Sequence, residues 1–453
     1  MKKSLLVSAV VTTLTFATSV SAAISKEQAD RLTRDLTPLG AERAGNVDGS
    51  IPAWTGEPLP VPVSFKGEGD HHPDPFAGDK PLFTIDASNV DQYADKLSEG
   101  QLSLFKKYPD SYKMHIYPSR RTATYPDWYA ENTYKVSQTA ELEEDGNGVK
   151  NAKAAIPFPI PDNGLQAVWN HLLRYQGKYR VASYAQVTPD VKGRYVIDRV
   201  NHYDYYPYYD ETGADDNGML TMFVANQVAP VRVAGDTFLF HDYVNPKLNP
   251  RNVWRYFSGQ RRVRRAPVFV YDTPIPPSYG YRTIDSYDMF FGAPDKYDWK
   301  LVGKKELYIP YNNYQLQSSA LKIKDIATPF HINPEHARYE LHRVWQVEAT
   351  LKEGERHIYK KRTFYLDEDT WTITVADLYD ERDNLWRVSV CYLKNYWEVP
   401  VTYTALEVHH DLLARRYNAL PLMNEESKTI DFSQPVPEAS FFTPASVRRM
   451  GTR

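Results

Sequence analysis

The spacing of apolar residues changes near residue 178, and this change is the strongest constraint on the fold. Upstream, apolar residues recur with the 3.6-residue period of helices, whereas downstream they alternate with polar residues as in half-buried strands. Short turns separate the alternating segments and leave little room for helices, which predicts an antiparallel meander. The predicted strands are 179–186, 194–200, 219–226, 236–243, 267–271, 299–309, 338–351, 357–366, 371–379 and 385–396.

A meander of about ten strands has to curl, close or be covered. We therefore predict a fold that is mainly β with a few helices, built as a barrel or a strongly curved half-barrel. The best hairpin pairs 338–351 with 357–366 across the turn at 352–356. Composition agrees, because the 34 Tyr suit half-buried pleated surfaces and the 32 Pro suit loops and edge strands.

The first residues have the pattern of a secretory signal. Two lysines precede an uncharged run with an apolar middle, and small residues follow at the end of that run. We predict a signal peptide over residues 1–22, cleaved after Ala22, with cleavage after Ala23 as the near alternative. An uncleaved anchor is disfavoured because the run is rich in Thr. No Cys lies near the cleavage site, so the mature protein is expected to be soluble in the periplasm without a lipid anchor.

The rest of the chain is predicted to have two parts. Residues 23–87 form a short helix, which begins at a capping box at Ser25, and an extended arm rich in Pro and Gly. Residues 88–453 form one domain of helices and the half-barrel. In this domain a helix is expected from Ser88, and the clearest amphipathic helix spans 163–176.

The sequence offers few candidates for covalent chemistry. It has no nucleophile elbow, P-loop or dinucleotide motif, and its histidines lack the spacing of a zinc site. We therefore predict no enzyme activity, metal or other cofactor. Asp285 with Asp288, and Asp367 with Asp369, are the carboxylate pairs that an exported glycan hydrolase would need, which is the least favoured alternative. The net charge of −3 argues against a nucleic-acid partner.

A cluster of arginines stands out in this slightly acidic chain: Arg261, Arg262, Arg264 and Arg265. Guanidinium groups bind phosphates and carboxylates, so these residues are candidates for an anionic head group or partner. In an exported protein this would be a phospholipid or lipopolysaccharide. The favoured alternative is that they pair with acidic residues on neighbouring strands.

Several runs resemble a known family. They are Asn249–Pro267, Thr283–Gly292 and Tyr297–Tyr311, with Pro157–Pro161, Trp169–Asn170 and Tyr359–Asp369 fitting the same pattern. The chain resembles the domain of unknown function 1329 family over roughly residues 40 to 445, and that family resembles the periplasmic lipoprotein carriers LolA and LolB. The resemblance implies an unclosed, curved antiparallel sheet with helices over its concave face. It implies no catalytic residues. Family members are often encoded beside an outer-membrane protein and a resistance-nodulation-division exporter, which are therefore possible partners.

A curved sheet with an apolar inner face and one amphipathic helix can shelter a lipid from water. We predict a soluble periplasmic carrier for a lipidic or lipid-anchored cargo, linking an inner-membrane exporter to the outer membrane. The alternative is an adaptor or scaffold for an outer-membrane protein that binds no ligand. The cavity candidates are Trp169, Leu172, Leu307, Ile309, Trp345, Val347, Phe364 and Leu366, although apolar stripes on sheets usually form packed core.

Overall fold

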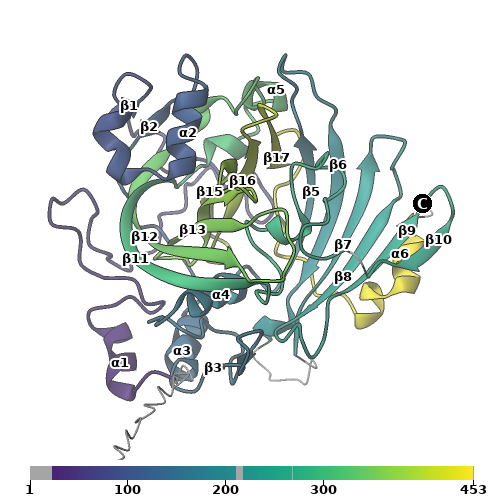
Figure 1. Ribbon diagram of the computed structural model, residues 1–453, viewed down its shortest axis with the longest axis horizontal. Helices are drawn as coiled ribbons and strands as arrows, with labels where there is room; N and C mark the ends of the chain where they lie inside the picture. Colours follow the sequence, from purple (N-terminus) through teal and green to yellow (C-terminus); the bar gives the residue numbers. More distant parts are fainter. Residues whose placement is uncertain (1–22, 211–217, 268, 452–453) are drawn as a thin grey trace, which may run out of the picture.

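One large curved sheet dominates the protein (Figure 1). The structure is a computed structural model that describes residues 23–210, 218–267 and 269–451, so the predicted signal peptide lies outside the described residues. The first group of strands is β5 (Tyr179–Val187), β6 (Asp198–Tyr205), β7 (Met219–Ala229), β8 (Thr237–Tyr243), β9 (Asn252–Phe257) and β10 (Arg262–Arg265). The second group is β11 (Tyr297–Pro310), β12 (Tyr339–Leu351), β13 (Lys361–Asp367), β14 (Ile373–Tyr379), β15 (Leu385–Tyr396), β16 (Val401–Asp411) and β17 (Arg416–Leu422).

Each group is an antiparallel meander in chain order, and the two groups join where β17 pairs with β5. Among the described residues, β11 pairs with β12 alone and β10 with β9 alone, so the sheet is open at both ends. Short strands β1 (Phe83–Ile85) and β2 (Met114–Ile116) extend the sheet, and β2 runs parallel to the start of β12. The predicted fold, a strongly curved and unclosed sheet, is confirmed, and this single parallel contact makes it a mixed sheet.

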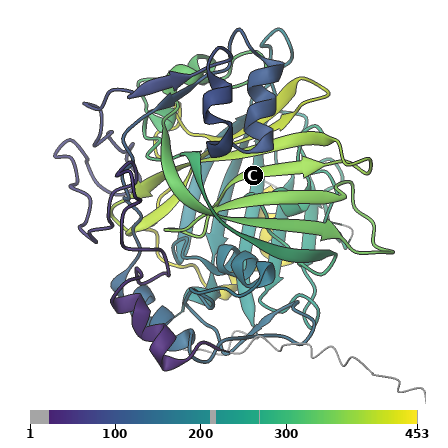
Figure 2. The same cartoon turned by 60° about the vertical axis from the view of Figure 1, so that its left-hand side comes forward.

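Helices cover both faces of the second meander. On the inner side α4 (Gly164–Leu173) packs against β11 and β12, and on the outer side α2 (Glu99–Lys107) packs against β14 and β15 (Figure 2). The remaining helices are α1 (Lys26–Asp30), α3 (Asp127–Val136), α5 (Ile323–Ile326) and α6 (Pro444–Gly451), and a small hairpin joins β3 (Glu141–Leu142) to β4 (Val149–Lys150). No helix in the described part of the chain has both the length and the apolar character needed to cross a membrane.

Most predicted elements form, with shifted bounds. The hairpin of β12 and β13 is confirmed, with Trp345 opposite Leu366 and Val347 opposite Phe364. The capping box at Ser25 is confirmed at the start of α1. The predicted helix 163–176 forms as α4, but it ends at Leu173 because the next residue turns to an extended conformation.

Three predictions of secondary structure were wrong in detail. The helix expected from Ser88 is a 3₁₀ turn over Val90–Lys96, and a second capping box at Ser98 then starts α2. The strand predicted at 194–200 begins only at Asp198. In the segment 267–271, residue 268 lies outside the described residues and the others form no strand, because Pro267 has no N–H to donate to a ladder.

Candidate functional site

The connection from β10 to β11 does not follow the outside of the sheet. Its residues 269–291, called the covering segment below, run across the inner face, and two buried ion pairs hold their end. Asp285 accepts hydrogen bonds from Arg362 of β13 at 2.6 Å and from Thr283 Oγ1 at 2.7 Å, and His357 Nε2 lies 3.0 Å away. Asp288 is paired with Arg174, directly after α4.

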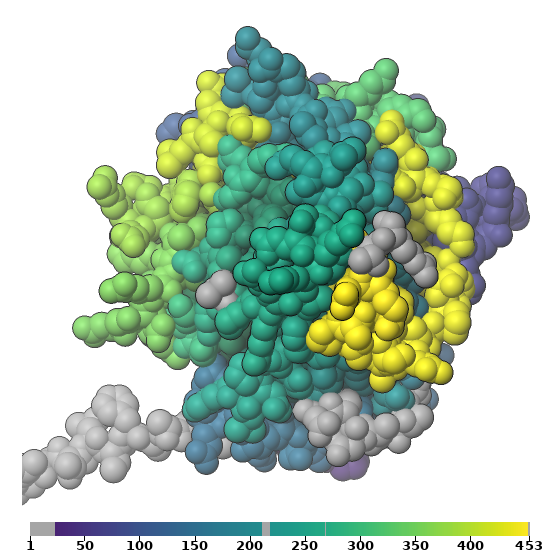
Figure 3. Space-filling model, turned by 90° about the vertical axis from the view of Figure 1, so that its right-hand side faces the viewer, coloured from purple at the N-terminus to yellow at the C-terminus, as the bar shows by residue number. Residues whose placement is uncertain are grey.

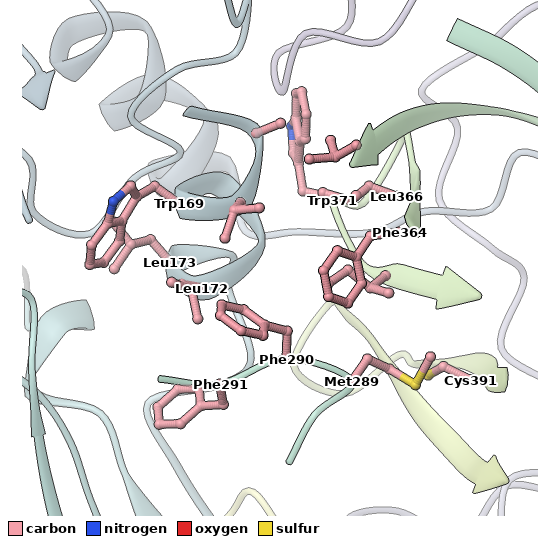
Figure 4. Packing of buried hydrophobic residues seen from close by; sticks show 14 of the residues in the cluster. Trp169, Leu172, Leu173, Met289, Phe290, Phe291, Phe364, Leu366, Trp371 and Cys391 are labelled. Atoms are coloured by element: carbon pink, nitrogen blue, oxygen red, sulfur yellow. The ribbon is translucent and has the colours of Figure 1, made fainter. Parts of the chain in front are cut away.

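Apolar packing continues this anchor. Phe290 lies between Leu172 of α4 and Phe364 of β13, and Met289 approaches Cys391 of β15 (Figure 4). The rings of Phe290 and Phe364 have centroids 5.7 Å apart. The end of the covering segment is therefore part of the main core, which fixes its position relative to the sheet.

A hollow lies between the covering segment and the inner face of β5 to β8, and together with the open solvent at its mouth it measures about 710 Å³. The strands contribute alternate residues, such as His202 with Val200, Phe223 with Ala225, and Phe238 with Phe240, which are the side chains on one face.

Stacked aromatic rings form the apolar wall of this cavity. Phe223 stacks on Phe240 with ring centroids 4.3 Å apart, and on Tyr287 of the covering segment at 5.5 Å. Phe238 contacts Phe269 at 5.4 Å. These rings come from two adjacent strands and from the covering segment, so together they present a continuous apolar surface to an occupant.

The opposite end of the cavity is polar. Gln186 lies opposite Asp198 in the β5–β6 register, and Gln227 of β7 lies opposite Val200, two residues along β6. These three side chains therefore lie together on one face. Arg282 of the covering segment reaches the same end, with Nη2 3.5 Å from Oε1 of Gln186.

Several polar atoms at this end are buried without a hydrogen-bond partner among the described residues. The four residues Gln186, Asp198, Gln227 and Arg282 are 4%, 1%, 7% and 4% exposed. Within the described part of the chain, both carboxylate oxygens of Asp198 lack a hydrogen-bond partner, as do Nε and Nη1 of Arg282, Nε2 of Gln186 and Oε1 of Gln227. Burial raises the pKa of Asp198 to about 6 and lowers the pKa of Arg282. Native proteins rarely leave such groups unsatisfied, so this end of the cavity has the capacity to bind a polar head group.

Sequence comparison places the chain in a family. The family described as "Protein of unknown function (DUF1329)" matches residues 84–448. The chain belongs to the DUF1329 family. An uncharacterized protein of Pseudomonas aeruginosa is 46% identical over 459 residues, which span 100% of this chain and 99% of the relative. The family predicted from the sequence runs is confirmed.

Solved structures of two kinds resemble this DUF1329 chain. A DUF1329 family protein from Desulfovibrio piger is 13% identical with a TM-score of 0.43, over 62% of this chain and 95% of the other. A LolA superfamily protein from Nitrosomonas europaea is 11% identical with a TM-score of 0.38, over 62% of this chain and 98% of the other. At such scores the likeness does not extend to ligand or activity, and the architecture rests on the strand pairings of the chain itself.

The predicted cavity residues fall into two groups. Five of them, Leu307, Ile309, Val347, Phe364 and Leu366, are 0% exposed and lie in the core between the second meander and α4. Trp345 is half-buried beside that core. Trp169 and Leu172 line a second hollow, which shares Arg251 and Phe291 with the first. Ligand contact at all eight positions stays a prediction.

The four predicted arginines lie on or beside the edge strand β10 and are exposed. Figure 3 shows this face, with α6 packed beside the edge strands. Arg265 donates to Asn252 of β9, but none of the four forms an ion pair with a described residue. The pairing with acidic neighbours that the sequence favoured is therefore not seen in the described part of the chain.

The candidate carboxylates are buried and engaged with neighbours. Asp285 and Asp288 hold the covering segment, and Asp369 accepts two hydrogen bonds from Arg121 at 2.6 and 2.9 Å. Asp367 is 0% exposed, and burial with repulsion from Asp369 raises its pKa. The ligating atoms of Asp367, Asp369 and His342 lie within 4.8 Å of one another, but all three are closed off from solvent. Each of the four carboxylates is 3% exposed or less.

Sequence reasoning missed the residues that line the main cavity. Phe223, Phe238 and Phe240 lie on strands that were predicted, and their alternation along those strands is the signal that was present. Arg282 gave none, because it lies in an irregular segment without periodicity.

Proposed function

We propose that this DUF1329 protein binds an apolar, lipid-like ligand without covalent chemistry and carries it through the periplasm. The observation that supports this most strongly is the aromatic cavity between β5–β8 and the covering segment. Packed protein interiors contain few voids larger than a water molecule, and an apolar wall is an unfavourable surface for water. The predicted signal peptide is the basis for the proposed location.

The energetics favour such a ligand. An acyl chain gains about 0.8 kcal/mol for each buried CH₂, so twelve buried groups supply about 10 kcal/mol. The cost of association is about 4–15 kcal/mol. Apolar contact therefore offsets much or all of the cost of association, and polar contacts at the far end of the cavity would add affinity and selectivity.

The unpaired arginines of β10 favour a second role, contact with an anionic surface or partner. Their exposure at a sheet edge suits docking to a membrane or to an outer-membrane protein. In this account the cavity holds the cargo, and the edge strand β10 contacts the membrane or protein that delivers or receives it. An exporter and an outer-membrane protein are the partners proposed from the family resemblance.

A fluorescent probe tests the proposal. N-phenyl-1-naphthylamine is neutral, apolar and brightens in apolar surroundings, so it should brighten with the mature protein. Ala225→Trp fills the cavity from β7 and should abolish this signal, whereas Val228→Trp, at a residue 42% exposed on the same strand, should preserve it. Equal thermal unfolding of both variants shows that folding is intact. No brightening with the wild-type protein, or equal brightening with both variants, contradicts the proposal.

A further inference from the structure

The cavity is amphipathic, and its polar end holds a buried guanidinium, that of Arg282, with unsatisfied hydrogen-bond donors. We infer that its ligand is a single-chain amphiphile with an oxyanion head group, which Arg282 binds while the tail lies along the aromatic wall. This inference rests on the proposed function and specifies the ligand class of the same cavity. The oxyanion is a carboxylate or a phosphate, because a guanidinium binds both through paired hydrogen bonds.

The argument begins with the hydrogen bonds that Arg282 lacks. Its Nε and Nη1 have no partner among the described residues, and its one recorded side-chain contact, to Gln186, is long at 3.5 Å. The edge of a guanidinium that meets both oxygens of a carboxylate is formed by Nε and Nη2, as Arg120 shows on Asp79. In Arg282, Nε is free and Nη2 makes only the long contact to Gln186. A buried guanidinium without such a partner is destabilising, and an anion in the cavity removes that cost.

Neighbouring acidic groups do not balance this charge. Glu407 is the acidic residue that attracts Arg282, but burial and repulsion from Asp288 raise the pKa of Glu407 to about 8, so near neutral pH it is mostly protonated. Asp198 has Tyr279 and Arg232 as its electrostatic neighbours instead. Arg251, the other arginine of the lining, is already paired with Asp242. Arg282 is thus the cation left available at this end of the described cavity.

The aromatic wall of the cavity is where the apolar tail of the ligand would lie. Tyr287 lies five residues after Arg282 in the covering segment and stacks on Phe223, which stacks in turn on Phe240. The lining then continues to Phe269, which is half-buried, and to Pro276, which is exposed. A head group at Arg282 therefore places the tail along aromatic rings, with a route toward solvent at the wall's exposed residues.

Ligands with matched tails test the inference. Palmitate, hexadecanol and lysophosphatidic acid with a palmitoyl tail are each used to displace N-phenyl-1-naphthylamine at pH 7.5. Palmitate or lysophosphatidic acid should displace half of the probe at a concentration at least tenfold below the one that hexadecanol requires. Comparing palmitate with lysophosphatidic acid then shows which oxyanion fits.

The variant Arg282→Gln should reduce that preference to about twofold or less while probe binding persists, and Arg282→Lys should retain part of it. Arg356→Gln removes the same charge from an exposed turn and should leave the preference unchanged. Arg282→Gln should also raise the thermal unfolding midpoint of the ligand-free protein, which a purely structural arginine would not do.

One result would contradict the head-group inference alone, and a different result would contradict the proposed function as well. If the probe binds but hexadecanol competes as well as palmitate and lysophosphatidic acid, the head-group inference is wrong and the proposed function stands. If neither the probe nor any of the three amphiphiles binds, the proposed function fails, and the inference fails with it. If Arg282→Gln does not fold, the inference is tested by the preference of the wild-type protein for palmitate or lysophosphatidic acid over hexadecanol, and by the reduced preference expected of Arg282→Lys.

Discussion

The ion pair between Asp285 and Arg362 should hold the covering segment against the sheet, and its removal gives a quantitative prediction. The two side chains are 4% and 1% exposed. Asp285→Asn leaves the Arg362 guanidinium buried without a charged partner, which costs about 3–5 kcal/mol. With an unfolding entropy of about 2 cal/mol/K for each residue, this lowers the thermal unfolding midpoint of a chain this long by roughly 3–6 °C. Circular dichroism measures the midpoint, and Asp298→Asn, at an exposed position on β11, is the matched control.

The pH dependence of this effect gives a second check. Burial by itself would raise the pKa of Asp285, but attraction to Arg362 and the contact with His357 outweigh it and hold that pKa well below the ordinary value. A carboxylate with a lowered folded-state pKa stabilises the protein above its unfolded pKa of about 4, and this contribution is lost as the pH falls further. The difference in thermal unfolding midpoint between the wild-type protein and Asp285→Asn should therefore reach its full value at pH 7 and be smaller at pH 3. A midpoint unchanged by the substitution, or a difference that grows on acidification, would refute the reasoning.

Two further predictions concern residues that the sequence singled out. Leu366→Ala should destabilise the protein by about 2–5 kcal/mol in urea unfolding, because Leu366 is fully buried, yet leave the affinity for N-phenyl-1-naphthylamine within twofold. A large loss of probe affinity without loss of stability would instead make Leu366 part of the ligand site. Replacing Arg261, Arg262, Arg264 and Arg265 together with Gln should leave the unfolding midpoint nearly unchanged, because all four are exposed, and should reduce co-sedimentation with phosphatidylglycerol vesicles by tenfold or more. Equal co-sedimentation of the variant would exclude this edge as an anionic docking surface.

The fold could be predicted where side-chain alternation is regular. The hairpin of β12 and β13 follows from alternating residues on both sides of one turn, although the connection is longer than predicted because β13 begins only at Lys361. Strand β16 was missed, since every residue from Val401 to Asp411 is buried and the strand shows no alternation. Its polar residues are instead matched across strands, as when His409 meets Ser389 at 2.8 Å. Helix α2 was also missed, although Ser98 and Gln101 carry a capping box.

The location of the site was harder to predict than the sheet. The sequence predicted a cavity between helix 163–176 and the strands beside it, but in the structure packed core residues occupy most of that space. The main cavity depends on the path of residues 269–291, an irregular segment with no periodic pattern. That path is held by contacts distant in sequence, such as Asp285 with Arg362 and Asp288 with Arg174. Such pairings depend on tertiary structure and leave no local signal.

Native mass spectrometry of the mature protein, purified from periplasm before and after organic extraction, tests the carrier function most directly. The account predicts a co-purifying mass that is lost on extraction, and that returns when the extracted protein is incubated with palmitate or lysophosphatidic acid. Ala225→Trp, prepared in the same way, should carry none. A single ligand-free mass in every preparation, with no added mass after incubation with either amphiphile, would contradict it.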